Sequence, residues 1–140
     1  MALELKIKKD VTIRSYNEID FTQIHNLNRR EEWNNLVEKQ DDTKKAWENS
    51  NVKFVACLND QIIGYIRGLT DGNITLYVSE LLIDKQYRGL GIGTKLLKYV
   101  HELYPKTRID LLASSSSQQY YETIKFRRFN GYRKTVLEWD

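Results

Sequence analysis

Hydrophobic positions recur with two different periods along the first half of the chain. Apolar residues at helical spacing predict helices, and compact apolar runs bounded by turn-forming residues predict strands. In order, the predicted elements are a strand at Val11–Tyr16, helices at about Asp20–Asn28 and Glu31–Lys45, and strands at Lys53–Leu58, Gln61–Thr70 and Ile74–Ile83. Asn59-Asp60 and Asp71-Gly72, which favour tight turns, separate the last three strands. These strands are therefore predicted to form an antiparallel meander.

The second half alternates between helical and extended patterns. The predicted elements are helices at Thr94–Tyr104 and Gln118–Ile124, and strands at Arg108–Ala113, Phe126–Phe129 and Tyr132–Trp139. Pro105 ends the first of these helices. Asn130-Gly131 between the last two strands is the signal of a type I′ hairpin. The strand, helix and strand between Ile74 and Ala113 make one β-α-β unit, so these two strands should be parallel.

Length and composition limit the class of protein. The 140 residues (16.6 kDa) predict one domain over residues 1–140. Hydrophobic residues at 41% and charged residues at 29% are typical of a globular domain. No apolar run approaches the roughly 18 residues of a membrane span, so no membrane partner is expected. The first ten residues, MALELKIKKD, lack the apolar segment of a signal peptide, and a cytoplasmic location is expected.

Residues that could bind metal ions are scarce. Cys57 is the only cysteine, and His25 and His101 are the only histidines. A disulfide framework or a metal site of cysteines and histidines is therefore not expected. The net charge of 22 − 19 = +3 is too small to indicate nucleic acid, which is not expected as a partner, and it fits an anionic small molecule.

A glycine-rich segment, RGLGIG at residues 88–93, lies between a predicted strand and a predicted helix. Glycine exposes backbone N–H groups, and at a helix N-terminus these groups attract phosphate. The P-loop pattern is absent because Lys95 follows Thr94 rather than glycine, and the GxGxG spacing departs from the dinucleotide fingerprint GxGxxG. The segment does match the pattern R-x-x-G-x-G, in which the fixed positions are Arg88, Gly91 and Gly93. A phosphate or pyrophosphate site is predicted, and a connector without ligand is the alternative.

Two segments together carry a resemblance to a known family. YVSELLIDKQYRGLGIG, at residues 77–93, resembles the central motif of the GNAT superfamily of acyl-CoA-dependent N-acetyltransferases, with Lys85 where the family often has proline. YYETIKF, at residues 120–126, resembles a second family stretch, with Lys125 in place of glycine. The resemblance implies an α/β (α+β) fold. Its sheet would be mixed, mostly antiparallel and of about six to seven strands, with helices on both faces and a central splayed pair of parallel strands.

The resemblance also implies a reaction and its residues. An acetyl group would pass from acetyl-CoA, as co-substrate, to a primary amine of a small molecule or peptide in a ternary complex. Tyr121 falls on the family's general acid, and Glu80 is a candidate for the base. A backbone N–H near Leu82 would polarise the thioester carbonyl. The residues implied to bind the cofactor are Leu81, Leu82, Ile83, Arg88, Gly89, Leu90, Gly91, Ile92, Gly93, Thr94 and, where many relatives carry an asparagine, Ser114.

Several alternatives accompany these expectations. Tyr120 is a second candidate for the acid, and Asp110 a weaker one for the base. Trp33 either lines the acceptor cleft or packs in the core. Aromatic and basic residues alternate in FRRFNGYRK, residues 126–134, which suits a non-catalytic RNA-binding module; a non-catalytic acyl-CoA-binding regulator is the other rival. The strand Tyr132–Trp139 is a plausible edge for a homodimer.

Overall fold

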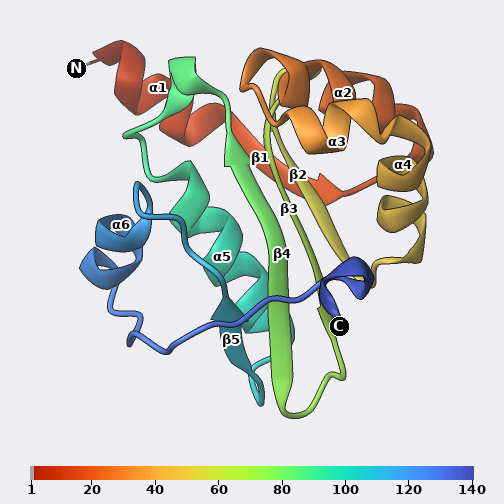
Figure 1. The fold of residues 1–140 in the computed structure, drawn as a ribbon. Coiled ribbons are helices and arrows are strands. Elements are labelled where there is room, and N and C mark those ends of the chain that lie inside the picture. The colour runs from red at the N-terminus through yellow and green to blue at the C-terminus, as the bar shows by residue number, and fades with distance from the viewer. Residues whose placement is uncertain (1) are drawn as a thin grey trace.

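The computed structural model describes residues 2–140 and contains one five-stranded sheet with helices on both faces (Figure 1). The strands lie in the order of the chain: β1 Val11–Ser15, β2 Val52–Leu58, β3 Gln61–Thr70, β4 Thr75–Ile83 and β5 Arg108–Leu111. Neighbouring strands are antiparallel except for β4 and β5, which are parallel. The mixed, mostly antiparallel fold is confirmed. The sheet has five strands rather than six to seven, and the parallel pair lies at its edge.

Six helices surround the sheet: α1 Ala2–Asp10, α2 Phe21–Arg30, α3 Asn34–Glu38, α4 Gln40–Asn49, α5 Ile92–Leu103 and α6 Gln118–Thr123. Short 3-10 turns lie at Glu18–Asp20, Lys85–Tyr87 and Val136–Glu138. The sequence patterns did not predict α1, whose nine residues include no buried one. Within residues 2–140, no helix is long and apolar enough to cross a membrane.

Two hydrophobic cores lie on the two faces of the sheet. The first core joins the sheet to α5 through buried residues such as Leu76, Val78, Leu96 and Val100. The second core joins the opposite face to α2 and α4; its buried residues are Phe21, Ile24, Leu27, Trp47, Val55, Cys57, Ile62, Tyr65 and Leu82. Cys57, a free cysteine, is thus buried in this second core.

β4 is irregular at Ser79. The register pairs Gly68 with Val78 but Arg67 with Glu80, so Ser79 is an extra residue, as in a β-bulge. A Cβ on Gly68 would lie 2.4 Å from the carbonyl oxygen of Tyr77, and only glycine allows this approach. β5 pairs with β4 only as far as Val78. Beyond the bulge, this edge of β4 has no strand partner within residues 2–140.

The prediction of a C-terminal hairpin at Phe126–Phe129 and Tyr132–Trp139 is wrong. Within this part of the chain the structure has only the 3-10 turn at Val136–Glu138, and the segment runs irregularly across β5 and β4 (Figure 1). A two-residue loop would place Arg128 opposite Arg133 and Arg127 opposite Lys134. Like charges directly opposite each other destabilise a strand pair. The missing hairpin accounts for the smaller number of strands.

A buried carboxylate fixes the approach to α2. Asp20 accepts two hydrogen bonds of 2.8 Å from the Arg14 guanidinium and one of 2.7 Å from the backbone N–H of Asn17. The Arg14 hydrogen bonds hold the pKa of Asp20 below its ordinary value, against the effect of burial.

Candidate functional site

The glycine segment forms an open loop between β4 and α5. Asp84, buried at the end of β4, accepts hydrogen bonds from the Gln86 backbone N–H (3.0 Å) and from Arg30 (3.1 Å), and these fix the start of the loop. Gly89 and Gly91 have φ of 79° and 80°, in the left-handed region that favours glycine. No atom lies within 4 Å of where a Cβ would stand on either residue. The loop is therefore open on its outer side.

The first turn of α5 faces this open space with unpaired donors. The hydrogen bond from the Lys95 N–H to the Gly91 carbonyl (3.0 Å) is the first of the helix. The N–H groups of Ile92, Gly93 and Thr94 precede it and have no acceptor inside the helix. Free N–H groups at the positive end of a helix dipole suit a phosphate or pyrophosphate. These residues fit the phosphate groups of an acyl-CoA.

Arg88 fastens the loop to the end of α2. Its guanidinium pairs with Glu31 and also donates from Nε to the Ile83 carbonyl (3.0 Å). The other carboxylate oxygen of Glu31 accepts from the Lys85 backbone N–H (3.1 Å). Arg88 thus shapes the loop in this structure.

The open edge of β4 presents the backbone of Leu81 and Ile83. The Asp84 N–H donates to the Ile63 carbonyl on β3 (2.8 Å). Because backbone groups alternate in direction along an antiparallel strand, Leu82, opposite Tyr65, also faces β3. The N–H groups that face the opening therefore belong to Leu81 and Ile83, whereas the sequence pointed to the neighbourhood of Leu82.

Two adjacent tyrosines of α6 occupy different surroundings. The Tyr120 hydroxyl lies 2.9 Å from the Thr94 hydroxyl and 3.0 Å from where a Cβ on Gly93 would stand, so it covers the start of α5. The Tyr121 ring packs on the first core, as do the side chains of Leu81 and Ile83. Burial, with a smaller contribution from Tyr120, raises the pKa of Tyr121 to about 12. Tyr121 thus keeps its proton at neutral pH.

Glu80 lies on the opposite face and is held by an ion pair. Arg67 donates to it from Nε and Nη2, each at 2.9 Å, and from Nη1 to the Ser50 hydroxyl at 3.1 Å. Both side chains of the pair are largely buried. Burial alone would lower the pKa of Arg67, but the hydrogen bonds and charge of Glu80 outweigh it and raise that pKa. The side chain of Glu80 is therefore held in position by Arg67.

Glu80 contributes to a cavity of 510 Å³ beside β4. The residues that line this cavity, which we name the acceptor cavity, are Glu32, Trp33, Asn34, Asn35, Leu36, Glu80 and Arg133. Trp33 packs on the second core, as one of its two expectations held, and it also lines this cavity. The acceptor cavity and Tyr121 lie on opposite faces of the sheet, with the open edge of β4 between them.

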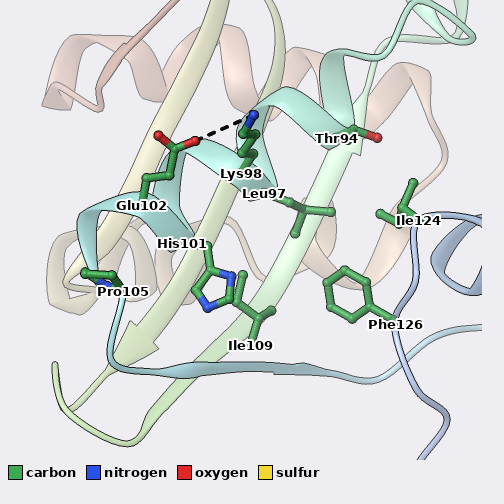
Figure 2. Close-up of a pocket in the computed structure, with 9 residues that line it drawn as sticks. All are labelled: Thr94, Leu97, Lys98, His101, Glu102, Pro105, Ile109, Ile124 and Phe126. Carbon is green, nitrogen blue, oxygen red and sulfur yellow. Dashed lines mark ion pairs between the residues drawn. The ribbon is translucent and has the colours of Figure 1, made fainter.

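A second cavity, of 370 Å³, runs along α5 from Thr94 to Pro105 (Figure 2). Ile109, Ile124 and Phe126 form its other side, and its lining is mainly apolar. Lys98, which lines it, is already paired with Glu102 at 4.0 Å. The cavity continues from the start of α5 but adds no free cation for a phosphate.

Ser114 lies in the turn that precedes α6. Its hydroxyl is 3.0 Å from that of Ser116 and 3.1 Å from that of Ser117. Its carbonyl accepts from the backbone N–H groups of Ser117 (3.0 Å) and Gln118 (3.1 Å). Ser114 therefore stabilises the turn into α6, and within residues 2–140 it makes no hydrogen bond with the glycine loop.

Sequence reasoning missed Arg67, Glu31 and Arg133. Counting equal steps back from the turn between β3 and β4 would place Arg67 opposite Ser79. The extra residue at Ser79 brings Arg67 opposite Glu80 instead, and no local pattern indicates that extra residue. Glu31 lies in a predicted helix, and no local signal indicates its contacts with Arg88 and Lys85. Arg133 was assigned to a hairpin, and no local signal indicates its place at the acceptor cavity.

An open loop at a helix N-terminus, beside the unpaired edge of a strand, gives this α/β domain an arrangement that suits a phosphate-bearing ligand. The model of the family described as Acetyltransferase (GNAT) domain matches residues 12–135, and the chain belongs to this family. A curated relative, an uncharacterised N-acetyltransferase from Methanocaldococcus jannaschii, is 42% identical over 55 residues, which are 39% of this chain. The match spans about a third (34%) of that relative's length.

Solved structures share the fold at low sequence identity. A GNAT-family acetyltransferase from Streptococcus pneumoniae has a TM-score of 0.75 at 19% identity, over 91% of this chain and 99% of its own. An aminoglycoside acetyltransferase from an uncultured soil metagenomic sample, in complex with sisomicin, has a TM-score of 0.68 at 18% identity, over 93% of this chain and 99% of its own. A predicted acetyltransferase from Clostridium acetobutylicum, with acetyl-CoA, has a TM-score of 0.68 at 17% identity, over 91% of this chain and 96% of its own.

Proposed function

We propose that this protein transfers an acetyl group from acetyl-CoA to a primary amine by direct attack in a ternary complex. The observation that carries the proposal is the placement of three groups around the open edge of β4. The glycine loop lies at its end, Tyr121 packs on one face, and Glu80 faces the acceptor cavity on the other. Cofactor and amine can therefore approach the same edge from opposite faces.

The cofactor is held by backbone groups. The N–H groups of Gly89 to Thr94 bind its pyrophosphate, and Tyr120 and Thr94 cover the start of α5 beside it. Leu81 and Ile83 direct backbone groups into the opening, where the pantetheine arm extends. Acetyl-CoA supplies an activated acyl group, and the N–H of Leu81 stabilises negative charge on the acyl oxygen.

Protons move at two positions. A primary amine has an ordinary pKa of about 10 and arrives protonated, so it must lose a proton before it can attack. Glu80 receives this proton directly or through water. A C–N bond then forms and the C–S bond breaks. Tyr121 donates a hydrogen bond to the departing sulfur, which finally takes the second proton that nitrogen loses.

A matched pair of glycine variants tests the cofactor half of the proposal. Gly91 and Gly72 have nearly the same φ, 80° and 81°, and a Cβ would meet nothing within 4 Å on either. Alanine at each position should cost about 1–2 kcal/mol of backbone strain. Only Gly91→Ala should also weaken acetyl-CoA binding, by tenfold or more in calorimetry, because Gly72 lies in the β3–β4 turn.

Two results would overturn this proposal. The first is the absence of acetyl-CoA binding at millimolar ligand, or equal affinity in the two glycine variants. The second concerns catalysis: a panel of amines that releases no free CoA thiol, while acetyl-CoA still binds, would favour the non-catalytic regulator.

A further inference from the structure

The acceptor cavity has one feature that acetyl transfer by itself does not require, which is a pair of opposite charges without partners. Glu80 is already paired with Arg67. Glu32 and Arg133, the other two charged residues of the lining, have no ion pair within residues 2–140. The cavity therefore offers one free negative and one free positive charge to a ligand.

We propose that the acceptor is a zwitterion, namely a small α-amino acid; this inference rests on the proposed function. The amine of the amino acid is acetylated, and its carboxylate binds Arg133. The ammonium group is attracted by Glu32 and lies toward Glu80, on the side of β4. A guanidinium pairs with a carboxylate through two parallel hydrogen bonds, which fixes the orientation as well as the charge.

The remaining lining suits a molecule of this size. The volume of 510 Å³ is within the range of about 300–1,000 Å³ that small-molecule sites occupy. Trp33 is half-buried and packs edge-on to Tyr65 with ring centroids 6.4 Å apart, so it offers a rigid apolar surface to the amino-acid side chain. Asn34 and Asn35 add amide groups that can donate or accept hydrogen bonds.

Two backbone features position the segments that carry these exposed charged residues. Glu32 has φ of 61°, which is unusual for a residue other than glycine, and it follows directly after α2. Its backbone N–H donates to the Arg29 carbonyl at 3.2 Å. On the other side, a Cβ on Gly131 would lie 2.3 Å from Leu112, so the C-terminal segment packs closely against the chain beyond β5 before it reaches Arg133.

The same charges disfavour purely cationic acceptors. A polyamine or an aminoglycoside carries several ammonium groups, and one of them would meet Arg133 in the cavity. Like charges at close range in a partly enclosed site cost affinity. The cavity thus selects against the acceptor class named for the aminoglycoside acetyltransferase that shares this fold.

Binding of matched ligand pairs tests the inference without relying on turnover. Each of a panel of α-amino acids is titrated into the protein saturated with CoA, and its affinity is measured by calorimetry. The affinity of the matching amine, which lacks only the carboxylate, is measured in the same way; phenylalanine and phenethylamine are one such pair. At least one acid should bind tenfold or more tightly than its partner amine. Arg133→Gln should reduce that difference to within about twofold. Arg127→Gln, the same charge change in the same segment but outside the cavity lining, should preserve it.

Each outcome decides the question. If no acid binds more tightly than its partner amine, or if spermidine binds more tightly than every acid, the inference is overturned. It is also overturned if the preference for the acid survives in Arg133→Gln. Acetyl-CoA binding is measured separately, so failure of the zwitterion inference with intact cofactor binding leaves the proposed function standing. Loss of cofactor binding would remove the proposed function instead.

Discussion

Tyr121→Phe isolates the proposed hydrogen bond to the departing sulfur because it removes one hydroxyl and keeps the ring. That ring packs edge-on to Tyr120 and Phe126, with centroids 5.0 and 5.5 Å away. The hydroxyl makes no hydrogen bond within residues 2–140, so its loss should change the free energy of unfolding by less than about 0.5 kcal/mol. Any large effect on rate then reports on the reaction itself.

The raised pKa of Tyr121 sets the size of the expected effect. A hydroxyl with a pKa of about 12 is a weaker acid than a thiol, whose ordinary pKa is about 8.5. Complete transfer of its proton to a thiolate would be uphill by about 5 kcal/mol. A hydrogen bond to the charged sulfur contributes about 1.5–3 kcal/mol instead. We therefore expect kcat to fall about 10- to 150-fold, which is mostly below the roughly 10²–10⁴-fold of full general acid catalysis.

The assay follows free CoA thiol with an acceptor from the amine panel, across a pH series. The affinity for acetyl-CoA should stay within about twofold, because the hydroxyl acts mainly in the transition state. Since Tyr121 keeps its proton up to a pH of about 12, this residue should produce no falling limb in the rate profile below about pH 11.

Tyr120→Phe is the matched control. The Tyr120 hydroxyl is engaged with Thr94 at the start of α5, so this variant should weaken acetyl-CoA binding and leave kcat within about threefold. Our assignment would be refuted if the two variants exchanged these effects, or if Tyr121→Phe left kcat within threefold.

Three further predictions concern stability. Gly68→Ala places a Cβ 2.4 Å from the Tyr77 carbonyl oxygen and should lower the free energy of unfolding by about 1–3 kcal/mol in urea titration; an unchanged midpoint would contradict the bulge geometry. Asp20→Asn should cost about 1.5–3 kcal/mol at pH 7. Because Arg14 lowers the pKa of Asp20, the advantage of the native carboxylate is full above its ordinary pKa of about 3.9 and should shrink as the pH falls below it. Lys125→Gly relieves a φ of 75° and should raise the melting temperature, corresponding to at most about 1 kcal/mol; a decrease would contradict it.

Most of the fold could be predicted because it depends on local patterns. Periodicity placed β2, β3, β4 and α5 to within one or two residues, and the β-α-β rule gave the parallel pairing of β4 with β5. The prediction of a C-terminal hairpin failed because it rested on the turn dipeptide Asn130-Gly131 alone. It did not take into account the like charges that strand pairing would place opposite each other. α1 carried no strong apolar stripe and was therefore missed.

The candidate site was only partly predictable, since its parts depend on contacts between distant segments. The glycine loop is a local signal, and the structure places it at the N-terminus of α5 as expected. Arg88 was linked to the phosphates, but its contacts with Glu31 and Ile83 join residues far apart in the chain. The place of Arg133 depends on how the C-terminal segment crosses the sheet, which no spacing in the sequence encodes.

The bulge at Ser79 connects these observations. Before it, Leu76 and Val78 point into the first core. Strict alternation would carry Glu80 into the same apolar core beneath α5, where a carboxylate has no partner. One extra residue moves Glu80 to the other face, where Arg67 and the acceptor cavity lie, and the pairing with β5 ends at the same point. The edge that opens beyond the bulge then presents the Leu81 N–H between the two faces. A single irregularity, allowed by Gly68, thus produces both the position of Glu80 and the open edge of β4 on which the proposed acyl transfer depends.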